Sequence, residues 1–224
     1  MSQLPYALLA LLLAAVAVRE RARRRRPARA AIISPPRSTV IARDGAVRSV
    51  QAAELTLDRA DLDRLWTPEN LENLARTYWR FLTRVTLGLI RVRYAADERS
   101  VTLLVRPLTL LRFGGPEYLI ESGHGKVVWH IRDGLLVARP GRGCGYLALD
   151  VRRLEHCEEE GRARVRIELE VANFYPAIAA GFSTPVYEVT QNAIHILVTH
   201  AFLRSLANLD LATSKVGRFR NGQP

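Results

Sequence analysis

The sequence predicts an α+β domain built from an antiparallel sheet of about six or seven strands and a long C-terminal helix. Apolar and polar residues alternate with a period of two through residues 89–172, and residues 184–208 form an apolar segment of helical length. The uncharged run of residues 4–18 predicts an N-terminal membrane-anchor helix. We therefore divide the chain into an anchor (1–18), an arginine-rich collar and linker (19–45), the folded domain (46–209) and a flexible tail (210–224).

The first helix of the domain is expected to follow Thr67. Thr67 suits the N-cap position because its side-chain oxygen can accept a hydrogen bond from a backbone N–H, and Pro68 suits the first helical position. Apolar residues recur from Leu71 at helical spacing, so the helix is predicted over residues 68–86. A weak strand is expected before it, within residues 46–57.

Short strand patterns separated by turn residues fill the middle of the chain. The clearest is RVRIELEVANF, residues 164–174, in which aliphatic residues face one way and charged residues face the other. Glu168 and Glu170 alternate with arginines on the charged face. This pattern is typical of solvated cross-strand ion pairs, and it does not support a pair of catalytic carboxylates converging in a cleft.

The last helix is expected to begin after Ser183. Thr184 suits its N-cap and Pro185 its first position, and the helix is predicted to reach about Asn208. Its surface is apolar over more than half of its circumference, so we expect several elements to pack around it.

The uncharged N-terminal run has two interpretations. As a helix, residues 4–18 span about 22 Å, which is short for a hydrocarbon core of about 30 Å unless Arg19 and Arg21 snorkel or the bilayer thins. A cleaved signal peptide is the alternative, because Ala15-Val16-Ala17 resembles a cleavage site. No basic residue precedes the run and a dense arginine cluster follows it. These features favour a single-pass anchor in the cell membrane with the main domain in the cytoplasm.

The positive charge of the chain is concentrated beside this run. The net charge is +11, and residues 19–29 contain seven arginines and one glutamate, which together supply +6. We expect this cluster to contact anionic lipid headgroups, each arginine contributing about 1 kcal/mol near the surface. No aromatic side chain is interleaved for base stacking, so no nucleic-acid partner is expected. The membrane-surface residues are Arg19, Arg21, Arg23, Arg24, Arg25 and Arg26.

The order of elements resembles the helix-grip fold of the START-like and polyketide cyclase/dehydrase-like superfamily. Three stretches carry the resemblance: VVWHIRDGLLVA (127–138), RVRIELEVANFYPAI (164–178) and VYEVTQNAIHILVTHAFLRSLA (186–207). The resemblance covers roughly residues 46–209 and is one of pattern. It implies a curved sheet wrapped on the C-terminal helix, with a cavity between them. It also implies an apolar ligand such as a lipid, sterol or polyketide, whereas it carries over no catalytic residue.

Two histidines lie in the last helix, within the stretch IHILVTHAFL. At about 100° per residue, His195 and His200 are roughly 140° apart, so they cannot act as neighbouring ligands or as a dyad. His195 lies on a polar edge, whereas His200 shares with Val189 and Ile196 the stripe that should face the sheet. Three roles for His200 stay open: a hydrogen-bonded core residue, a polar group that orients a ligand at the cavity wall, or a general base.

Trp129 and Tyr146 are the other candidate ligand-binding side chains. Trp129 belongs to an apolar strand face, where tryptophan is more often a core residue, and Tyr146 offers a hydroxyl group to a pocket. The histidines and the two cysteines, Cys144 and Cys157, show no metal-binding spacing, so neither a metal nor a cofactor is expected. The cysteines are interpreted as free thiols in a reducing compartment.

Three functions are compatible with these features. The leading one is a membrane-anchored domain that binds a hydrophobic small molecule or lipid between its sheet and its C-terminal helix. The second is a cyclase-like or hydrolase-like enzyme with His200 as its general base, although the sequence favours a protein that is not an enzyme. The third is a non-catalytic scaffold for a membrane complex, which predicts a core without a cavity. No pattern indicates the oligomeric state.

Overall fold

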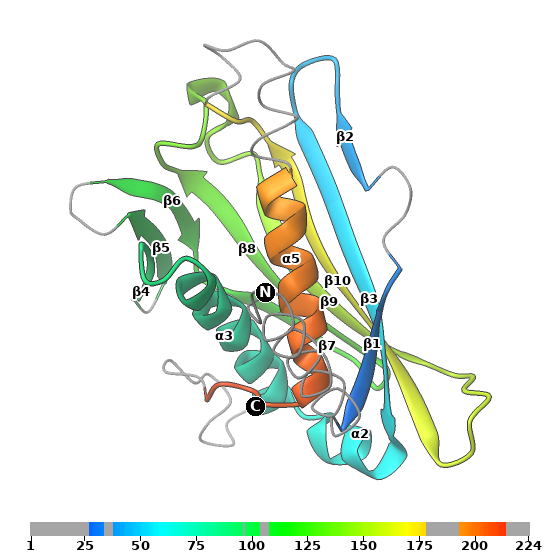
Figure 1. The fold of residues 1–224 in the computed structure, drawn as a ribbon. Coiled ribbons are helices and arrows are strands. Elements are labelled where there is room, and N and C mark those ends of the chain that lie inside the picture. The colour runs from blue at the N-terminus through cyan, green and yellow to red at the C-terminus, as the bar shows by residue number, and fades with distance from the viewer. Residues whose placement is uncertain (1–26, 34–37, 96, 104–107, 178–192, 214–224) are drawn as a thin grey trace, which may run out of the picture.

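The computed structural model describes residues 27–33, 38–95, 97–103, 108–177 and 193–213. Within these residues, a ten-stranded antiparallel sheet carries three α-helices on one face (Figure 1). The strand order is β1-β3-β10-β9-β8-β6-β5-β4, with β2 paired to β3 and β7 paired to β8. The predicted α+β class and antiparallel sheet are therefore confirmed.

The elements have the following bounds. The strands are β1 (Ala28–Ile32), β2 (Thr39–Ile41), β3 (Val47–Asp58), β4 (Ile90–Tyr94), β5 (Glu98–Leu103), β6 (Thr109–Gly114), β7 (Glu117–Ile120), β8 (His124–Asp133), β9 (Tyr146–Leu154) and β10 (Arg162–Phe174). The helices are α2 (Arg59–Leu65), α3 (Pro68–Val85) and α5 (Ala193–Ser205), and the 3-10 turns are η1 (Arg139–Gly141) and η4 (Leu206–Asn208).

The sheet has more strands than the predicted six or seven. β1 and β2 lie in the stretch that sequence analysis assigned to the collar and linker, and both pair with β3. β1 is short and rich in alanine and β2 has three residues, so neither shows a strong alternation. Their strand conformation depends on pairing with β3, a contact that local sequence patterns do not reveal.

The two faces of the sheet differ in polarity. On β10, the inward residues Val165, Ile167 and Leu169 are buried, while the outward residues form ion pairs. Glu170 bonds Arg48 across the sheet at 2.7 Å, and Glu168 bonds Arg166 on its own strand. The charged row therefore forms ion pairs as predicted, and the apolar face is left for the helices.

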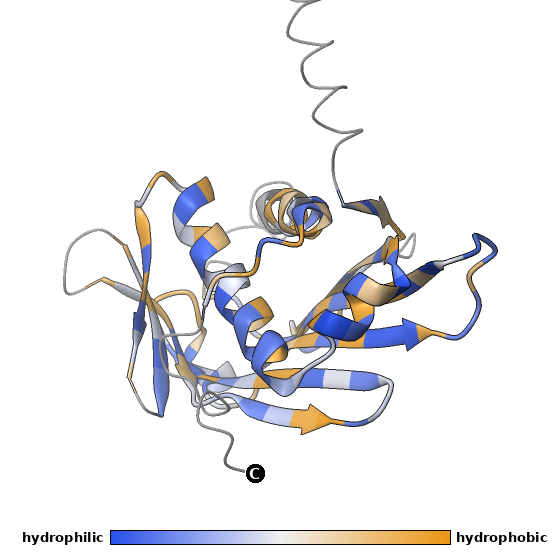
Figure 2. Ribbon diagram, turned by 90° about the horizontal axis from the view of Figure 1, so that it is seen from below, coloured by the Kyte–Doolittle hydropathy of each residue, from blue (hydrophilic) through white to orange (hydrophobic). Residues whose placement is uncertain are grey.

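All three α-helices cover the apolar face. α3 packs against β8 and β4, and α5 packs against β3 and β1. Seen from below, the sheet curves beneath the helices (Figure 2). Aromatic rings join the layers, because Trp79 of α3 makes edge contacts with Phe113 and Trp129 of the sheet, and Tyr78 contacts Phe202 of α5.

The two predicted helices differ in how far they are described. α3 spans Pro68–Val85, and the Thr67 side chain accepts a hydrogen bond from the Asn70 backbone N–H as an N-cap. α5 and η4 cover residues 193–208 of the predicted C-terminal helix, whereas residues 184–192 lie outside the described part of the chain. The short helix α2 before α3 was not predicted from sequence.

The expected single-pass localisation in the cell membrane requires correction. Across the part of the chain that the structure describes, no helix combines the length and the hydropathy needed to cross a membrane. The apolar run of residues 4–18 and the arginines of residues 19–26 lie outside the described residues. A membrane-spanning anchor is therefore not supported.

Candidate ligand-binding cavity

Described residues line two apolar cavities, and the larger lies between the sheet and the helices α3 and α5. Its volume is about 370 Å³, within the range of about 300–1,000 Å³ that is usual for small-molecule pockets. Strands β3, β4, β5, β6, β8, β9 and β10 contribute to its wall. The described residues that line it are Val47, Ser49, Tyr78, Trp79, Leu82, Ile90, Val101, Leu110, Leu111, Phe113, Ile131, Leu136, Leu147, Val171, Phe174 and Val198.

The wall of the larger cavity is almost entirely apolar. None of the described lining residues is charged. Tyr78 presents a buried ring, and burial raises the pKa of its hydroxyl, so this group stays protonated. The indole nitrogen of Trp79 is itself inaccessible. Ser49 therefore stands out as a small polar side chain in a wall of aliphatic and aromatic groups.

Ser49 begins a chain of hydrogen bonds that leads to the last helix. Its hydroxyl lies 3.0 Å from the Thr39 hydroxyl and accepts a hydrogen bond from Gln51 Nε2 at 3.4 Å. Gln51 Oε1 lies 2.8 Å from His200 Nε2. Ser49 is 3% exposed and Gln51 is 0% exposed, so both are enclosed in the core. Strand β3 thus places Ser49 and Gln51 on its inward face, where they form hydrogen bonds with each other and Gln51 also bonds His200.

His200 is partly buried on α5 and faces β3 through its contact with Gln51. Because an amide oxygen only accepts, His200 Nε2 donates this hydrogen bond. Burial lowers the pKa of His200 below its usual value, and the nearby positive charge of Arg204 lowers it further. His200 is not among the described residues that line either cavity. His200 faces β3 as the sequence indicated, but it contacts the polar chain instead of the cavity.

The other predicted ligand-binding residues are scattered. Trp129 is buried in the core against Trp79 and lines a void of only about 20 Å³. Tyr146 lies on the outer face of the sheet, where burial and then the neighbouring Glu170 raise its pKa. Ile196 lies on α5 but does not line either cavity, whereas Val198 lines the larger cavity. Val189 lies outside the described residues.

Sequence analysis missed Ser49 and Gln51. The segment VRSVQAAELTLD forms β3, and its inward positions are Val47, Ser49, Gln51 and then three apolar residues. Two polar residues at inward positions weaken the alternation, which is why this strand was predicted only weakly. The same interruption was a usable signal, because a polar side chain at an inward position needs a partner.

The smaller cavity lies beneath α2 and the start of α3 and has a volume of about 170 Å³. Leu55 and Leu57, at the far end of β3, contribute to it, and His124 borders it. The described residues that line it are Leu55, Leu57, Leu62, Leu65, Trp66, Thr67, Pro68, Asn70, Leu71, Leu74, Ile120, His124, Gly125, Val151, Val165, Ile167, Leu206, Leu209 and Leu211.

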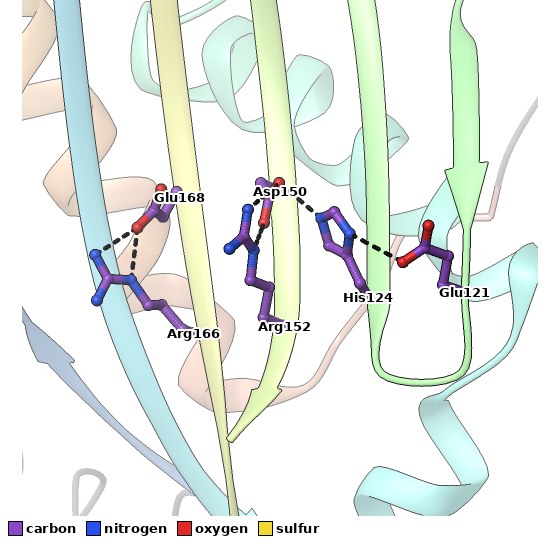
Figure 3. Close-up of polar contacts among 6 residues, drawn as sticks. All are labelled: Glu121, His124, Asp150, Arg152, Arg166 and Glu168. Atoms are coloured by element: carbon purple, nitrogen blue, oxygen red, sulfur yellow. Dashed lines mark hydrogen bonds and ion pairs between the residues drawn. The ribbon is translucent and has the colours of Figure 1, made fainter. Parts of the chain in front are cut away.

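His124 also joins a polar cluster on the outer face of the sheet. His124 Nε2 lies 2.8 Å from Asp150 Oδ2, and Nδ1 lies 3.7 Å from Glu121 Oε2. Figure 3 shows these side chains in front of the strands, with the helices behind. Burial opposes ionisation of Asp150, but hydrogen bonds from Arg152 and His124 outweigh it and lower its pKa. Both ring nitrogens of His124 thus face carboxylates, as part of a polar network on the outer face of the sheet.

The described residues contain no group of three or more His, Cys, Asp or Glu arranged to hold a metal ion. Cys144 is exposed and Cys157 is half-buried, and both are free thiols.

No family model and no curated protein match the chain. Among solved structures, the chain is similar to a conserved protein from Geobacillus kaustophilus, with 10% identity, 70% of this chain and 94% of that chain covered, and a TM-score of 0.33. It is similar to human STARD10, with 9% identity, coverage of 76% and 72%, and a TM-score of 0.30. It is also similar to norcoclaurine synthase from Thalictrum flavum, with 11% identity, coverage of 75% and 87%, and a TM-score of 0.30. Similarities at this level assign neither a family nor a ligand, so function is argued from the cavity.

Proposed function

We propose that this domain binds an apolar small molecule in the larger cavity, between the sheet and the helices α3 and α5. The observation that carries the proposal is an apolar volume of about 370 Å³ whose described wall holds no charged side chain. Transfer of an apolar ligand from water into such a space is favourable by about 25 cal/mol for each Å² of apolar surface that it buries.

Two features of the site separate this proposal from its rivals. A general base must reach its substrate within hydrogen-bonding distance, whereas His200 donates its Nε2–H to Gln51 and does not line the cavity. The enzyme hypothesis therefore loses the base on which it depended. The scaffold hypothesis predicts a core without a cavity, and the volume beneath α3 and α5 speaks against it.

The proposal is tested by filling the cavity. Val198 lines the cavity from α5, so Val198→Trp should place a large side chain in the volume that a ligand needs. Binding of the uncharged dye Nile red to the full chain, followed by fluorescence, is expected to weaken by about tenfold or more, since lost contact area of this size costs more than 1 kcal/mol.

The matched control is Val128→Trp. Val128 lies on β8, on the face of the sheet that points away from the helices and the larger cavity. Val128 alternates with the inward residues Val127 and Trp129 of β8 and does not line either cavity. This variant should bind the dye as the wild-type chain does, with circular dichroism to confirm that both variants fold. A wild-type chain that binds no dye, or equal weakening in both variants, would contradict the proposed function.

A further inference from the structure

The larger cavity has one small polar group in its described wall, the hydroxyl of Ser49. Ser49 lies near the start of β3 with its side chain on the helix-covered face, and it is 3% exposed. Its neighbours in the wall are Val47 on β3 and Val171 on β10, which pairs with Ser49, and both side chains offer only carbon atoms. A ligand that fills the cavity therefore contacts a mostly apolar wall, in which Ser49 and Tyr78 are the described residues with a side-chain hydroxyl.

The hydrogen bonds of Ser49 leave one position of its hydroxyl unused. A serine hydroxyl has one proton and two lone pairs. Gln51 Nε2 donates to one lone pair, and the contact with Thr39 uses either the second lone pair or the proton. If Thr39 donates, Ser49 keeps its proton for a ligand acceptor. If Ser49 donates, it keeps a lone pair for a ligand donor.

The buried residue Gln51 fixes the orientation of the Ser49 side chain. Gln51 has no exposed surface, and its two amide atoms are used by His200 on one side and by Ser49 on the other. Swinging the amide away from Ser49 would also break its bond to His200 and leave buried polar atoms without partners. The hydrogen bonds among Ser49, Gln51 and His200 therefore fix the direction in which the unused position of the Ser49 hydroxyl points.

From this geometry we infer that the cavity takes an uncharged apolar molecule bearing a hydroxyl or carbonyl oxygen, which forms a hydrogen bond with Ser49. This inference rests on the proposed function and narrows its ligand class. An ionised carboxylate, phosphate or ammonium group would enter a wall whose described residues offer no opposite charge, and an unpaired buried charge is strongly disfavoured. A ligand hydroxyl completes the unused position of Ser49 whichever direction its bond to Thr39 takes, because a hydroxyl both donates and accepts, whereas a carbonyl oxygen completes it when Thr39 donates and Ser49 keeps its proton.

The test compares three nine-carbon ligands on the full chain at pH 8: nonan-1-ol, nonan-2-one and nonanoate. Each is titrated against bound Nile red, and its affinity is taken from displacement of the dye. The wild-type chain is expected to bind nonan-1-ol at least about tenfold more tightly than nonanoate, since burial of an unpaired charge costs far more than burial of a hydroxyl. This comparison needs no variant, so it does not depend on how a substitution folds.

Ser49→Ala then tests the residue itself. Loss of one hydrogen bond of typical strength corresponds to about a fivefold change in affinity. The variant should bind nonan-1-ol about fivefold more weakly, with its affinity for Nile red measured separately because the dye also carries a carbonyl oxygen. Ser49→Thr, which retains a hydroxyl, should recover part of the loss. Thr56→Ala, on the outer face of the same strand, should leave every affinity as in the wild-type chain.

Two results would overturn the inference: nonanoate binding as tightly as nonan-1-ol, or an unchanged affinity of Ser49→Ala for nonan-1-ol. These failures are distinct from failure of the proposed function. If Nile red binds and Val198→Trp removes it, the cavity is a ligand site, and a null result with Ser49→Ala rejects only the ligand class. If Nile red does not bind the wild-type chain, both are rejected.

Discussion

A buried polar side chain on β3 fixes the position of the His200 imidazole. Gln51 is fully enclosed and accepts a hydrogen bond from His200 Nε2, so the imidazole is held against the strand. Burial lowers the pKa of His200, and the charge of Arg204 acts in the same direction. The neutral form of His200 is therefore the form that the folded protein favours.

This lowered pKa predicts a loss of stability on mild acidification. The unfolded chain takes up a proton at His200 near its ordinary pKa of about 6.5, whereas the folded chain takes it up only at lower pH. The stability contribution is fully present above about pH 6.5 and is lost as the pH falls toward the lowered folded pKa. His200→Gln, whose amide can still donate to Gln51, should show a smaller decrease in unfolding free energy between pH 7.5 and pH 5.5.

The measurement is urea unfolding at each pH, with wild-type and variant compared. The other histidines are present in both chains, so their contributions cancel in the difference. An equal decrease in both chains would show that His200 has the same pKa folded and unfolded, and would contradict the prediction.

Single residues also mark the limit of the sequence analysis. Helical spacing separated His195 from His200 and directed His200 toward the sheet, and the structure places His200 against β3. The role of Ser49 depends on Gln51, two residues along the same strand, and on Thr39, which approaches through the pairing of β2 with β3. The interrupted alternation of β3 could have marked both inward polar residues, but tertiary contacts decide which of them reaches the cavity.

At the scale of elements, α3 owes its beginning to its own sequence. Thr67 Oγ1 accepts a hydrogen bond from the Asn70 backbone N–H, and Pro68 occupies the first turn. These are interactions between residues close in sequence, which is why the start of this helix was predicted correctly. β1 and β2 are the opposite case, because their strand conformation follows from pairing with β3.

Removal of the N-cap should therefore loosen α3 locally. Thr67→Ala leaves the Asn70 N–H without its side-chain partner, and the unfolding free energy should fall by about 1 kcal/mol. Thr67→Ser keeps a capping oxygen and serves as the control, with little expected change. Thermal unfolding measures both variants. If Thr67→Ser were as destabilised as Thr67→Ala, the loss would come from packing at the smaller cavity, which Thr67 also lines, and not from the cap.

At the scale of the whole molecule, β3 contributes to both cavities. Its start contributes Val47 and Ser49 to the larger cavity, and its end contributes Leu55 and Leu57 to the smaller one. It pairs with β10 along one edge and with β1 and β2 along the other. The family resemblance implied a curved sheet wrapped on the C-terminal helix, whereas the edge formed by β1 and β2 was assigned to a linker.

That edge predicts where the stable domain begins. Ala28 is 2% exposed and pairs with Leu57, and Ile32 pairs with Ala53. β1 also contacts α5 and η4. A chain that starts at residue 46 loses these contacts and exposes the edge of β3, which becomes open to pairing with other chains. We expect its unfolding free energy to fall by about 2 kcal/mol or more, the effect of uncovering one aliphatic side chain, and its solutions to scatter more light on heating.

A chain that starts at residue 27 is the matched control, because it also lacks residues 1–26 but keeps β1 and β2. It should unfold at a higher temperature than the chain that starts at residue 46. Since β1 covers Leu57, a residue of the smaller cavity, the shorter chain should also show new dye binding at that end of the sheet, a change that Val198→Trp does not prevent. Equal unfolding temperatures for chains starting at residues 27 and 46 would mean that β1 adds nothing to stability, and that the domain begins where the sequence pattern placed it.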